Sequence, residues 1–257
     1  MQEKLGLRRG VVVSCKNPMN CFLASIIVCA TAAAFGADLN TLTPEETAAG
    51  WKLLFDGSTT NGWRAYAHQE FPSPRWLVKD GCLCVEQPGG ANASDLVTTE
   101  KFGDFDLKFQ WRISPAGNSG VKYYVKEGKT GRSGVGFEYQ MLDDEKNDDS
   151  LNGGKHQAGA LYDLFAPNDQ KRLKPVGEFN ESEIIVRGNH VEHWLNGAKI
   201  VEFELGSPEL KEAIARSKFK NIKGFGEKIP TVILLQDHGS PVWFRNLKIH
   251  PSNSPSP

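Results

Sequence analysis

Apolar and polar residues alternate along most of the chain, a pattern typical of short β-strands. The clearest run is residues 105–113, in which Phe105, Phe109 and Ile113 lie on one face and polar residues on the other. Similar runs recur at short spacing, and the Asp80-Gly81 and Asn196-Gly197 pairs between them favour two-residue hairpin turns. Strands do not alternate with helices, so the pattern predicts about a dozen strands in an antiparallel β-sandwich or jelly roll.

Two segments carry helix signals within this β pattern. Thr43 precedes Pro44 and stands three residues before Glu46, the spacing of a capping box, which predicts a short helix. Ser207 followed by Pro208 begins a second predicted helix of about three turns. The sequence therefore predicts an all-β fold with one or two short helices.

The first residues differ in character from the rest of the chain. Residues 1–37 combine a basic lead with an apolar run at 21–34 and small residues after it, which predicts a secretory signal peptide. The apolar run is shorter than the roughly 20 residues of a membrane span. We therefore expect an exported protein, periplasmic or extracellular, with no stable span after cleavage. The folded domain is expected at 42–251, followed by a frayed tail at 252–257.

Composition narrows the classes of partner and of site. The 257 residues carry a formal net charge of -1, which provides no field for nucleic acid. Outside the leader the cysteines are Cys82 and Cys84, two residues apart on one strand, where a disulfide would be strained. Without a nearby Cys/His pair they do not form a zinc site, and we expect them to be small core residues.

Polar residues gather in the middle of the chain. Glu138 and Gln140 share one face of a predicted strand, about 7 Å apart. An acidic loop that includes Asp143 follows, and His156 then leads into a second strand-like run with Tyr162. Such groups can perform acid–base chemistry, bind sugar hydroxyls or hold a metal ion. The alternative is a polar strand face with a solvated acidic loop.

Three further polar groups are candidates for a carbohydrate site. They are Arg112 with Lys122, His193 beside Trp194, and Gln236 and His238 with Trp243. Aromatic rings stack on sugar rings, and amides, carboxylates and imidazoles bind hydroxyls. The alternatives are core packing for Trp243 and a half-buried structural role for His193. Residues 118–120 predict a turn, followed by a strand with Lys122 and Tyr124 on one face.

Several motifs resemble one bacterial family. In order they are LFDGSTTNGW, WRISPAGNSGVKYYV, GFEYQMLDD, HQAGALYDLFAP, VEHWLNGAKIVEFELGS and LQDHGSPVWFRNLKI, covering about residues 42–251. In these motifs the chain is similar to the 3-keto-disaccharide hydrolases, also described as 3-keto-glucoside 1,2-lyases and hydratases. The resemblance implies a concanavalin A-like jelly-roll β-sandwich and export, in agreement with the strand pattern and the leader.

The resemblance implies chemistry on oxidised sugars. A ketone at C3 makes the C2 proton acidic, and the enolate formed by its removal expels the group at C1. Water then adds to the resulting glycal, so the net result is hydrolysis. The reaction needs a base at C2, an electrophile at the C3 oxygen and an acid for the leaving oxygen. A divalent metal ion can be the electrophile. An upstream glycoside 3-oxidoreductase would have to supply the 3-keto-disaccharide or other oxidised glycoside.

The sequence and the resemblance together give three sets of candidate residues. The catalytic candidates are Glu138, His156 and Asp143, with Glu138 or His156 as the base. The candidates for substrate binding are Gln140, Arg112, Lys122, Tyr162, Gln236 and Trp243. The candidates for a metal ligand or the acid are His193 and His238. In an alternative without a metal ion, Lys122 or Arg112 stabilises the enolate.

Two other functions remain open at this point. One is an ordinary jelly-roll glycoside hydrolase, but the Glu-x-Asp-x-Glu pattern of many such enzymes is replaced by Glu138, Gln140 and Leu142. A retaining hydrolase also needs two carboxyl groups about 5 Å apart. The other is a non-catalytic carbohydrate-binding module, which would bind glycans without turnover.

Overall fold

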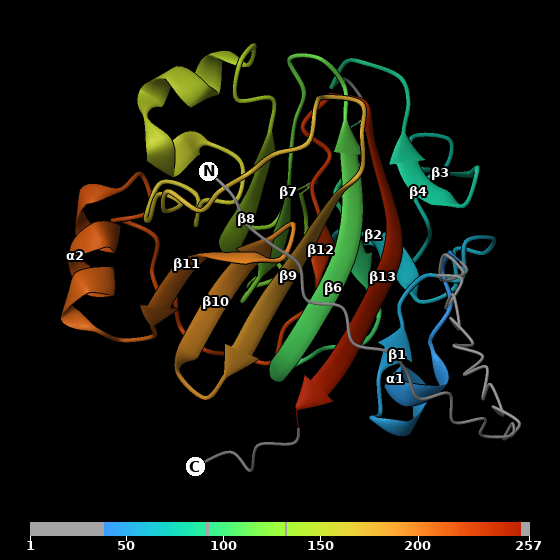
Figure 1. Cartoon of the computed structure of the whole chain (residues 1–257), viewed down its shortest axis with the longest axis horizontal. Coiled ribbons are helices and arrows are strands. Elements are labelled where there is room, and N and C mark those ends of the chain that lie inside the picture. The colour runs from blue at the N-terminus through green and yellow to red at the C-terminus, as the bar shows by residue number, and fades with distance from the viewer. Residues whose placement is uncertain (1–38, 91–92, 132, 253–257) are drawn as a thin grey trace, which may run out of the picture. The chain divides into compact units, whose positions relative to one another are not determined.

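The computed structural model describes residues 39–90, 93–131 and 133–252 (Figure 1). The predicted signal peptide and all but the first residue of the predicted tail lie outside these residues. The helices of the described part are α1 (Pro44–Ala48) and α2 (Pro208–Arg216), with 3-10 turns η1 (Asp148–Asn152) and η2 (Gly154–His156). None of these helices is long and apolar enough to cross a membrane.

The strands of the described residues form two antiparallel sheets. The larger sheet has the order β11-β10-β9-β6-β13-β4-β3, with β1 paired to β13. Its strands are β1 (Lys52–Leu53), β3 (Leu77–Lys79), β4 (Cys82–Val85), β6 (Asp104–Ile113), β9 (Asn180–Arg187), β10 (His190–Leu195), β11 (Ala198–Glu204) and β13 (Val242–Ser252). The smaller sheet has the order β2-β5-β12-β7-β8. Its strands are β2 (Trp63–Ala65), β5 (Leu96–Thr98), β7 (Asn118–Tyr123), β8 (Phe137–Leu142) and β12 (Leu234–Leu235).

The two sheets stack as layers, with β7, β8 and β12 behind the larger sheet in Figure 1. Aromatic side chains fill the space between them. Phe109 on β6 meets Tyr139 on β8 edge to face, with ring centroids 5.6 Å apart. Phe105 meets Tyr123 in the same way at 6.2 Å. The predicted all-β, concanavalin A-like jelly-roll sandwich is therefore confirmed, as is the inward face of the run at 105–113.

The local signals for turns and caps are also confirmed. Asp80 and Gly81 have φ values of 50° and 70°, the left-handed geometry of a type I′ hairpin turn. Thr43 and Glu46 form a reciprocal capping box at the start of α1. Helix α2 begins after Ser207, whose side chain accepts from the Leu210 N–H, but it ends sooner than its pattern predicts. Cys82 and Cys84 are buried and free.

Two local predictions are wrong. Residues 118–120 belong to β7 rather than to a turn, because they pair along β8, with Gly120 opposite Gln140. Tyr124 does not share a strand face with Lys122, because its φ of 52° takes the chain out of the strand and its ring packs in the core. The turn residues in the sequence were thus overridden by pairing with the neighbouring strand.

The predicted second strand after His156 is also absent from the described residues. This segment instead meets the free edge of β8 through isolated bridges, such as Tyr139 to Leu161. Gly159 and Asp163 have φ values of 84° and 60°, which breaks the extended conformation. The segment still closes over β8 in the hairpin-like manner expected, and it brings Tyr162 to that strand through the Tyr162 N–H donated to the Glu138 carbonyl at 3.0 Å.

A buried chain of hydrogen bonds connects the two sheets. The Trp111 indole N–H donates to Ser182 Oγ at 2.9 Å, and Ser182 Oγ donates to the Tyr139 hydroxyl at 2.8 Å. The Tyr139 hydroxyl donates in turn to the Trp194 carbonyl at 3.1 Å. Each polar group in this chain is therefore satisfied away from water.

Replacing Ser182 tests this connection. We expect Ser182→Ala to lower the free energy of unfolding by about 1–3 kcal/mol, because the buried Trp111 N–H loses its acceptor. Urea unfolding measured by far-ultraviolet circular dichroism would give this value. Thr130→Ala, at an exposed position, is the control and should change it by less than about 0.5 kcal/mol. Equal effects from the two substitutions would contradict the assignment.

Candidate functional site

A pocket of about 300 Å³ opens on the outer face of the smaller sheet, over β7, β8 and the end of β12. Six of the residues singled out from the sequence line it. They are Lys122, Glu138, Gln140, Tyr162, Gln236 and His238. Asn118, at the start of β7, lines it as well. The structure thus brings together polar residues from three separate parts of the sequence.

Strand register explains why these residues meet. Lys122 on β7 lies directly opposite Glu138 on β8, and both point away from the core because their neighbours point into it. Gly120, two pairs further along and therefore on the same face, leaves space for the carboxylate. A Cβ atom at Gly120 would lie 2.4 Å from Glu138 Oε1. The Gln236 N–H donates to the Gly120 carbonyl at 2.9 Å, which places Gln236 beside the pair.

A charged pair forms the floor of the pocket. Lys122 Nζ lies 3.6 Å from Glu138 Oε2, and each side chain is only 8% exposed. The Gln236 amide bridges the two in the orientation that satisfies both partners. Its nitrogen donates to Glu138 Oε1 at 3.1 Å, and its oxygen accepts from Lys122 Nζ at 2.9 Å. Because the two charges compensate each other in a largely dry site, removal of one would leave the other unpaired.

Gln140 adds an unused acceptor to this floor. The residue is only 1% exposed, and its side-chain oxygen has no hydrogen-bond partner within the described part of the chain. A buried acceptor without a partner is uncommon in a folded protein, because its desolvation costs free energy. A bound hydroxyl would satisfy it.

Tyr162 lines one side of the pocket and is fixed from behind. Its hydroxyl donates to Asp149 Oδ2 at 2.9 Å, and His156 Nδ1 lies 3.0 Å from Asp149 Oδ1. Burial, together with the hydrogen bond to Asp149, raises the pKa of Tyr162. Burial alone would raise the pKa of Asp149. The hydrogen bonds from Asn152 and Tyr162, together with the nearby His156, outweigh burial and lower this pKa. His156 therefore stands behind Tyr162 and does not line the pocket.

An apolar wall and one further cation complete the pocket, and no pattern in the sequence indicates them. Lys218 Nζ lies 4.1 Å from the centre of the Tyr162 ring. Phe219, Ile222 and Val135 provide apolar surface beside it. The Lys218 N–H donates to Asp163 Oδ2 at 2.8 Å, which ties the segment after α2 to the segment that carries Tyr162. Only this tertiary contact brings the wall to the site, so no local pattern could have indicated it.

The segment that carries Gln236 and His238 is held by a buried ion pair. Arg75 Nε and Nη2 donate to the two oxygens of Asp237, both at 2.6 Å. The Asp237 N–H donates to Asp95 Oδ1 at 3.0 Å. The hydrogen bonds to Asp237 raise the pKa of Arg75, and burial raises the pKa of Asp95. A bidentate pair of this kind fixes the backbone on both sides of Asp237.

Comparison with known proteins identifies the family. A family model described as a 3-keto-alpha-glucoside-1,2-lyase-like domain matches residues 50–250. The chain belongs to this family. A 3-keto-disaccharide hydrolase of Bacteroides thetaiotaomicron is 31% identical, aligned over 95% of each chain. The resemblance stated from the sequence motifs is therefore confirmed, and the family is one of carbohydrate-active enzymes.

Solved structures agree with this assignment. A protein of Parabacteroides distasonis ATCC 8503, provisionally named a glycosyl hydrolase, is 33% identical. It superposes with a TM-score of 0.75 over 84% of this chain and 100% of its own. A second protein of that strain with the same provisional name is 26% identical, with a TM-score of 0.58 over 75% of this chain and 100% of its own.

Besides His156, three predicted site residues on other parts of the fold lie away from the pocket. Asp143 accepts from the Ala116 N–H at 2.7 Å and the Glu145 N–H at 3.1 Å, so its carboxylate stabilises the loop after β8. Arg112 and Trp243 stack on each other, with the guanidinium carbon 4.3 Å from the ring centre. They lie on the outer face of the larger sheet, because their neighbours Trp111 and Phe244 point into the core.

His193 is also separate from the pocket. It is fully buried between the sheets, with Nε2 2.9 Å from the Tyr123 hydroxyl and Nδ1 3.2 Å from the Gly159 carbonyl. Burial lowers its pKa from 6.5 to about 4, although the contact with Gly159 acts in the other direction. Both ring nitrogens are therefore occupied, and the structure does not bring His193 and His238 together as ligands of one ion.

The pocket itself does not fit a divalent metal ion. Among its lining residues the carboxylate is Glu138 and the imidazole is His238. The Lys122 ammonium group, 3.6 Å from that carboxylate, already stands where a cation would bind. A site for a divalent ion usually offers three or more protein ligands without an adjacent positive charge.

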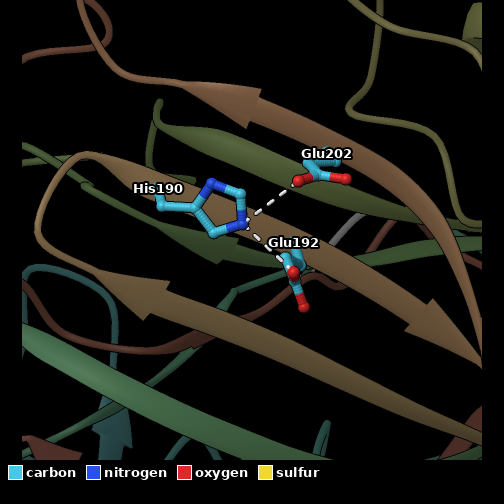
Figure 2. Close-up of side chains that lie close together, drawn as sticks. All are labelled: His190, Glu192 and Glu202. Atoms are coloured by element: carbon cyan, nitrogen blue, oxygen red, sulfur yellow. Dashed lines mark hydrogen bonds and ion pairs between the residues drawn. The ribbon is translucent and has the colours of Figure 1, made fainter.

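A cluster of acidic residues around His190 on the larger sheet is neutralised by the protein's own cationic side chains. Figure 2 shows His190 facing Glu192 and Glu202, with Nε2 at 3.1 and 3.4 Å from their oxygens. Lys199 Nζ lies 3.2 Å from Glu192 and 2.5 Å from Glu202. Hydrogen bonds to Glu192 and Glu204 raise the pKa of His190, which favours the charged form of the imidazole. The cluster is therefore an ion-pair network.

The buried position of His193 predicts a dependence of stability on pH. Its folded pKa of about 4 lies below the ordinary 6.5, so between these values only the unfolded chain takes up the proton. Stability from His193 is complete above pH 6.5 and is lost as the pH falls, by about 2–3 kcal/mol at pH 4.5.

Urea unfolding at pH 7 and 4.5 would measure this loss. In His193→Gln, whose amide can still reach the Tyr123 hydroxyl, the difference between the two pH values should shrink by that amount. His68→Gln, at an exposed position, is the matched control and should leave the difference unchanged. A difference that is the same in wild type and His193→Gln would show that His193 is not a neutral core residue.

Proposed function

We propose that this protein cleaves 3-keto-glycosides by removing the C2 proton and eliminating the group at C1. The observation that carries the proposal is the Lys122–Glu138 pair, 3.6 Å apart on the floor of the pocket. In a 3-keto-glycoside the acidic C2 hydrogen and the C3 oxygen lie on neighbouring carbon atoms. A carboxylate and an ammonium group at this spacing can therefore reach both at once.

Glu138 is the base in this proposal, and Lys122 is the electrophile. Glu138 takes the C2 proton, and the electron pair moves toward the C3 oxygen, where the Lys122 ammonium group stabilises the enolate. The electron pair then returns as the C1–O bond breaks, which leaves a 2-hydroxy-3-keto-glycal. The amide of Gln236 keeps both charged groups in position. Water added across the new double bond completes a net hydrolysis, and this second step is the hydratase activity.

The leaving oxygen needs a proton, and His238 is the group that we assign to this role. It is exposed at the opening of the pocket, where a leaving group would depart. Tyr162 is less suited, because its hydroxyl proton is already donated to Asp149 and its pKa is raised. We assign Tyr162 and Gln140 to binding substrate hydroxyls, and His156 to positioning Tyr162 through Asp149.

The proposed substrate is a 3-keto-disaccharide, by analogy with the Bacteroides thetaiotaomicron relative of that name. An upstream oxidoreductase that oxidises C3 of the glycoside would supply it. On the basis of the leader at residues 1–37 we also propose that the protein is exported.

An ordinary retaining glycoside hydrolase is less consistent with this pocket. Such an enzyme needs a second carboxyl group about 5 Å from the first. Glu138 is the carboxylate among the described lining residues, and its closest charged neighbour is an ammonium group. Asp143, which the sequence had placed nearby, is engaged in its own loop.

Substitution of the charged pair tests the proposal. We expect Glu138→Gln to lower kcat for a 3-keto-disaccharide by about 10²–10⁴-fold, the usual contribution of a general base. Lys122→Met should lower kcat by about 10²–10³-fold, because the developing charge on the C3 oxygen loses its stabilising cation. The ultraviolet absorbance of the enone product and chromatography of the released sugar would follow both steps.

The exposed pair Lys52 and Glu100, 2.6 Å apart, provides matched controls. Lys52→Met and Glu100→Gln should leave turnover unchanged, and circular dichroism would confirm that all four variants fold. Near wild-type turnover by folded Glu138→Gln would overturn the assignment of the base. Binding of glycans without turnover of keto or ordinary glycosides by the wild type would favour a binding module.

Removal of metal ions gives a separate prediction. Because the electrophile in this proposal is the Lys122 ammonium group, prolonged treatment with EDTA should change kcat by less than about twofold. The assay is the same product formation, before and after dialysis against the chelator. Loss of turnover that an added divalent ion restores would assign the electrophile to a metal and would contradict the role of Lys122.

A further inference from the structure

Two arginines share an aromatic surface on the outer face of the larger sheet. Arg112 lies on β6 between Phe179, just before β9, and Trp243 on β13; these strands lie side by side in Figure 1. Its guanidinium carbon is 5.0 Å from the centre of the Phe179 ring and 4.3 Å from that of Trp243. The guanidinium carbon of Arg245, also on β13, is 3.7 Å from the same Phe179 ring.

These two arginines differ from others on the molecule in having no acidic partner. Among the described residues, no carboxylate lies within 4.0 Å of Arg112 or Arg245. By contrast, Arg64, Arg75 and Arg187 each form an ion pair with a carboxylate. Two like charges brought to one ring therefore remain uncompensated by the protein.

Hydrogen bonding at the two guanidinium groups is incomplete as well. Arg245 Nε donates to Gln110 Oε1 at 2.8 Å, but Arg112 Nε is buried and meets no acceptor in the described part of the chain. Burial, and then the neighbouring Arg112 charge, lower the pKa of Arg245, although Cys82 acts in the opposite direction. The protein thus provides Arg112 with neither a carboxylate nor an acceptor for its Nε among the described residues, and its charge is left to an external partner.

The nearest acidic groups do not neutralise the pair. Glu86 on the adjacent loop accepts a hydrogen bond from Trp243 and is attracted by the Arg112 charge, but its carboxylate forms its ion pair with Lys79, 2.9 Å away. Glu181 is on β9 opposite Gln110, two residue pairs along from Arg112. It forms no ion pair with either arginine. The surface therefore carries a local excess of positive charge on a protein of formal net charge -1.

We propose that this arginine–aromatic surface, made of Arg112, Arg245, Phe179, Trp243 and Gln110, binds the carboxylate of an acidic saccharide. Guanidinium groups bind carboxylates through paired hydrogen bonds, which would compensate the charge of the two arginines. The Trp243 ring offers the flat apolar face on which a sugar ring stacks. A neutral sugar would leave the two arginine charges uncompensated. An inorganic anion would leave the Trp243 ring exposed.

This surface is distinct from the pocket and does not depend on the proposed function. The pocket opens on the outer face of the smaller sheet, whereas this surface lies on the outer face of the larger one. A uronate bound here would hold the enzyme on an acidic polymer while the pocket remained free. Binding can therefore be measured without turnover of any substrate.

Titration with digalacturonate tests the proposal, with cellobiose and inorganic sulfate as the neutral and non-sugar probes. We expect isothermal titration calorimetry and quenching of tryptophan fluorescence to show binding of digalacturonate that weakens as sodium chloride is raised. The double variant Arg112→Gln, Arg245→Gln should bind it at least about tenfold more weakly, the usual effect of losing a charge-assisted hydrogen bond. Trp243→Leu should abolish the fluorescence change and weaken binding.

Arg187→Gln is the matched control, because Arg187 also lies at the larger sheet but is paired with Asp106 at 2.7 Å. It should bind digalacturonate as the wild type does, and thermal unfolding would confirm that every variant folds. Sulfate that binds as tightly as digalacturonate would show a general anion site and overturn the saccharide. Equal binding of digalacturonate by wild type and the double variant, or no binding by the wild type, would overturn the site.

Discussion

The strict alternation of side chains along β8 is the constraint on which the site depends. Phe137 and Tyr139 are fixed in the core by aromatic neighbours from the facing sheet, Tyr139 by Phe109 and Phe137 by Phe203. Because successive residues of a strand point to opposite faces, the Glu138 side chain must point away from the core. A shift of one residue would bury the carboxylate and expose the rings, so the same packing that stabilises the sandwich also orients the floor of the pocket.

The Lys122–Glu138 pair on this floor is explained better by a role in function than by a contribution to stability. A buried ion pair gains little over apolar residues of the same size, because both ions lose their hydration. Lys122 and Glu138 are nevertheless kept together by strand register, by the missing side chain at Gly120 and by the Gln236 bridge. Three independent features thus maintain an arrangement that stability alone does not require, which is the usual mark of a site with a function.

The fold and part of the candidate site could be predicted from the sequence. Features that depend on neighbouring residues in the chain were predictable, and features that depend on contacts between distant segments were not. Glu138 and Gln140 were found because period two is visible within one strand, and the turns were found because Gly and Asn permit positive φ. The partnership of Lys122 with Glu138 was not visible, since it depends on register between strands and residues 118–120 resemble a turn. For His193 the sequence left a site role and a structural role open, because a polar residue within a strand does not show which face is buried. Lys218 enters the site through a tertiary contact that has no pattern in the chain.

Buried charges are compensated differently on the two outer faces of the sandwich. On the smaller sheet, Lys122 is compensated by a carboxylate from the neighbouring strand, so the charged pair needs no ligand to balance it. On the larger sheet, the rings of Phe179 and Trp243 provide only the weaker attraction of aromatic faces to Arg112, and its Nε donor meets no acceptor among the described residues. A compensated pair of charges is suited to catalysis, in which charge moves between fixed groups. A pair of uncompensated arginines is suited to binding, because a ligand that brings negative charge gains free energy by balancing them.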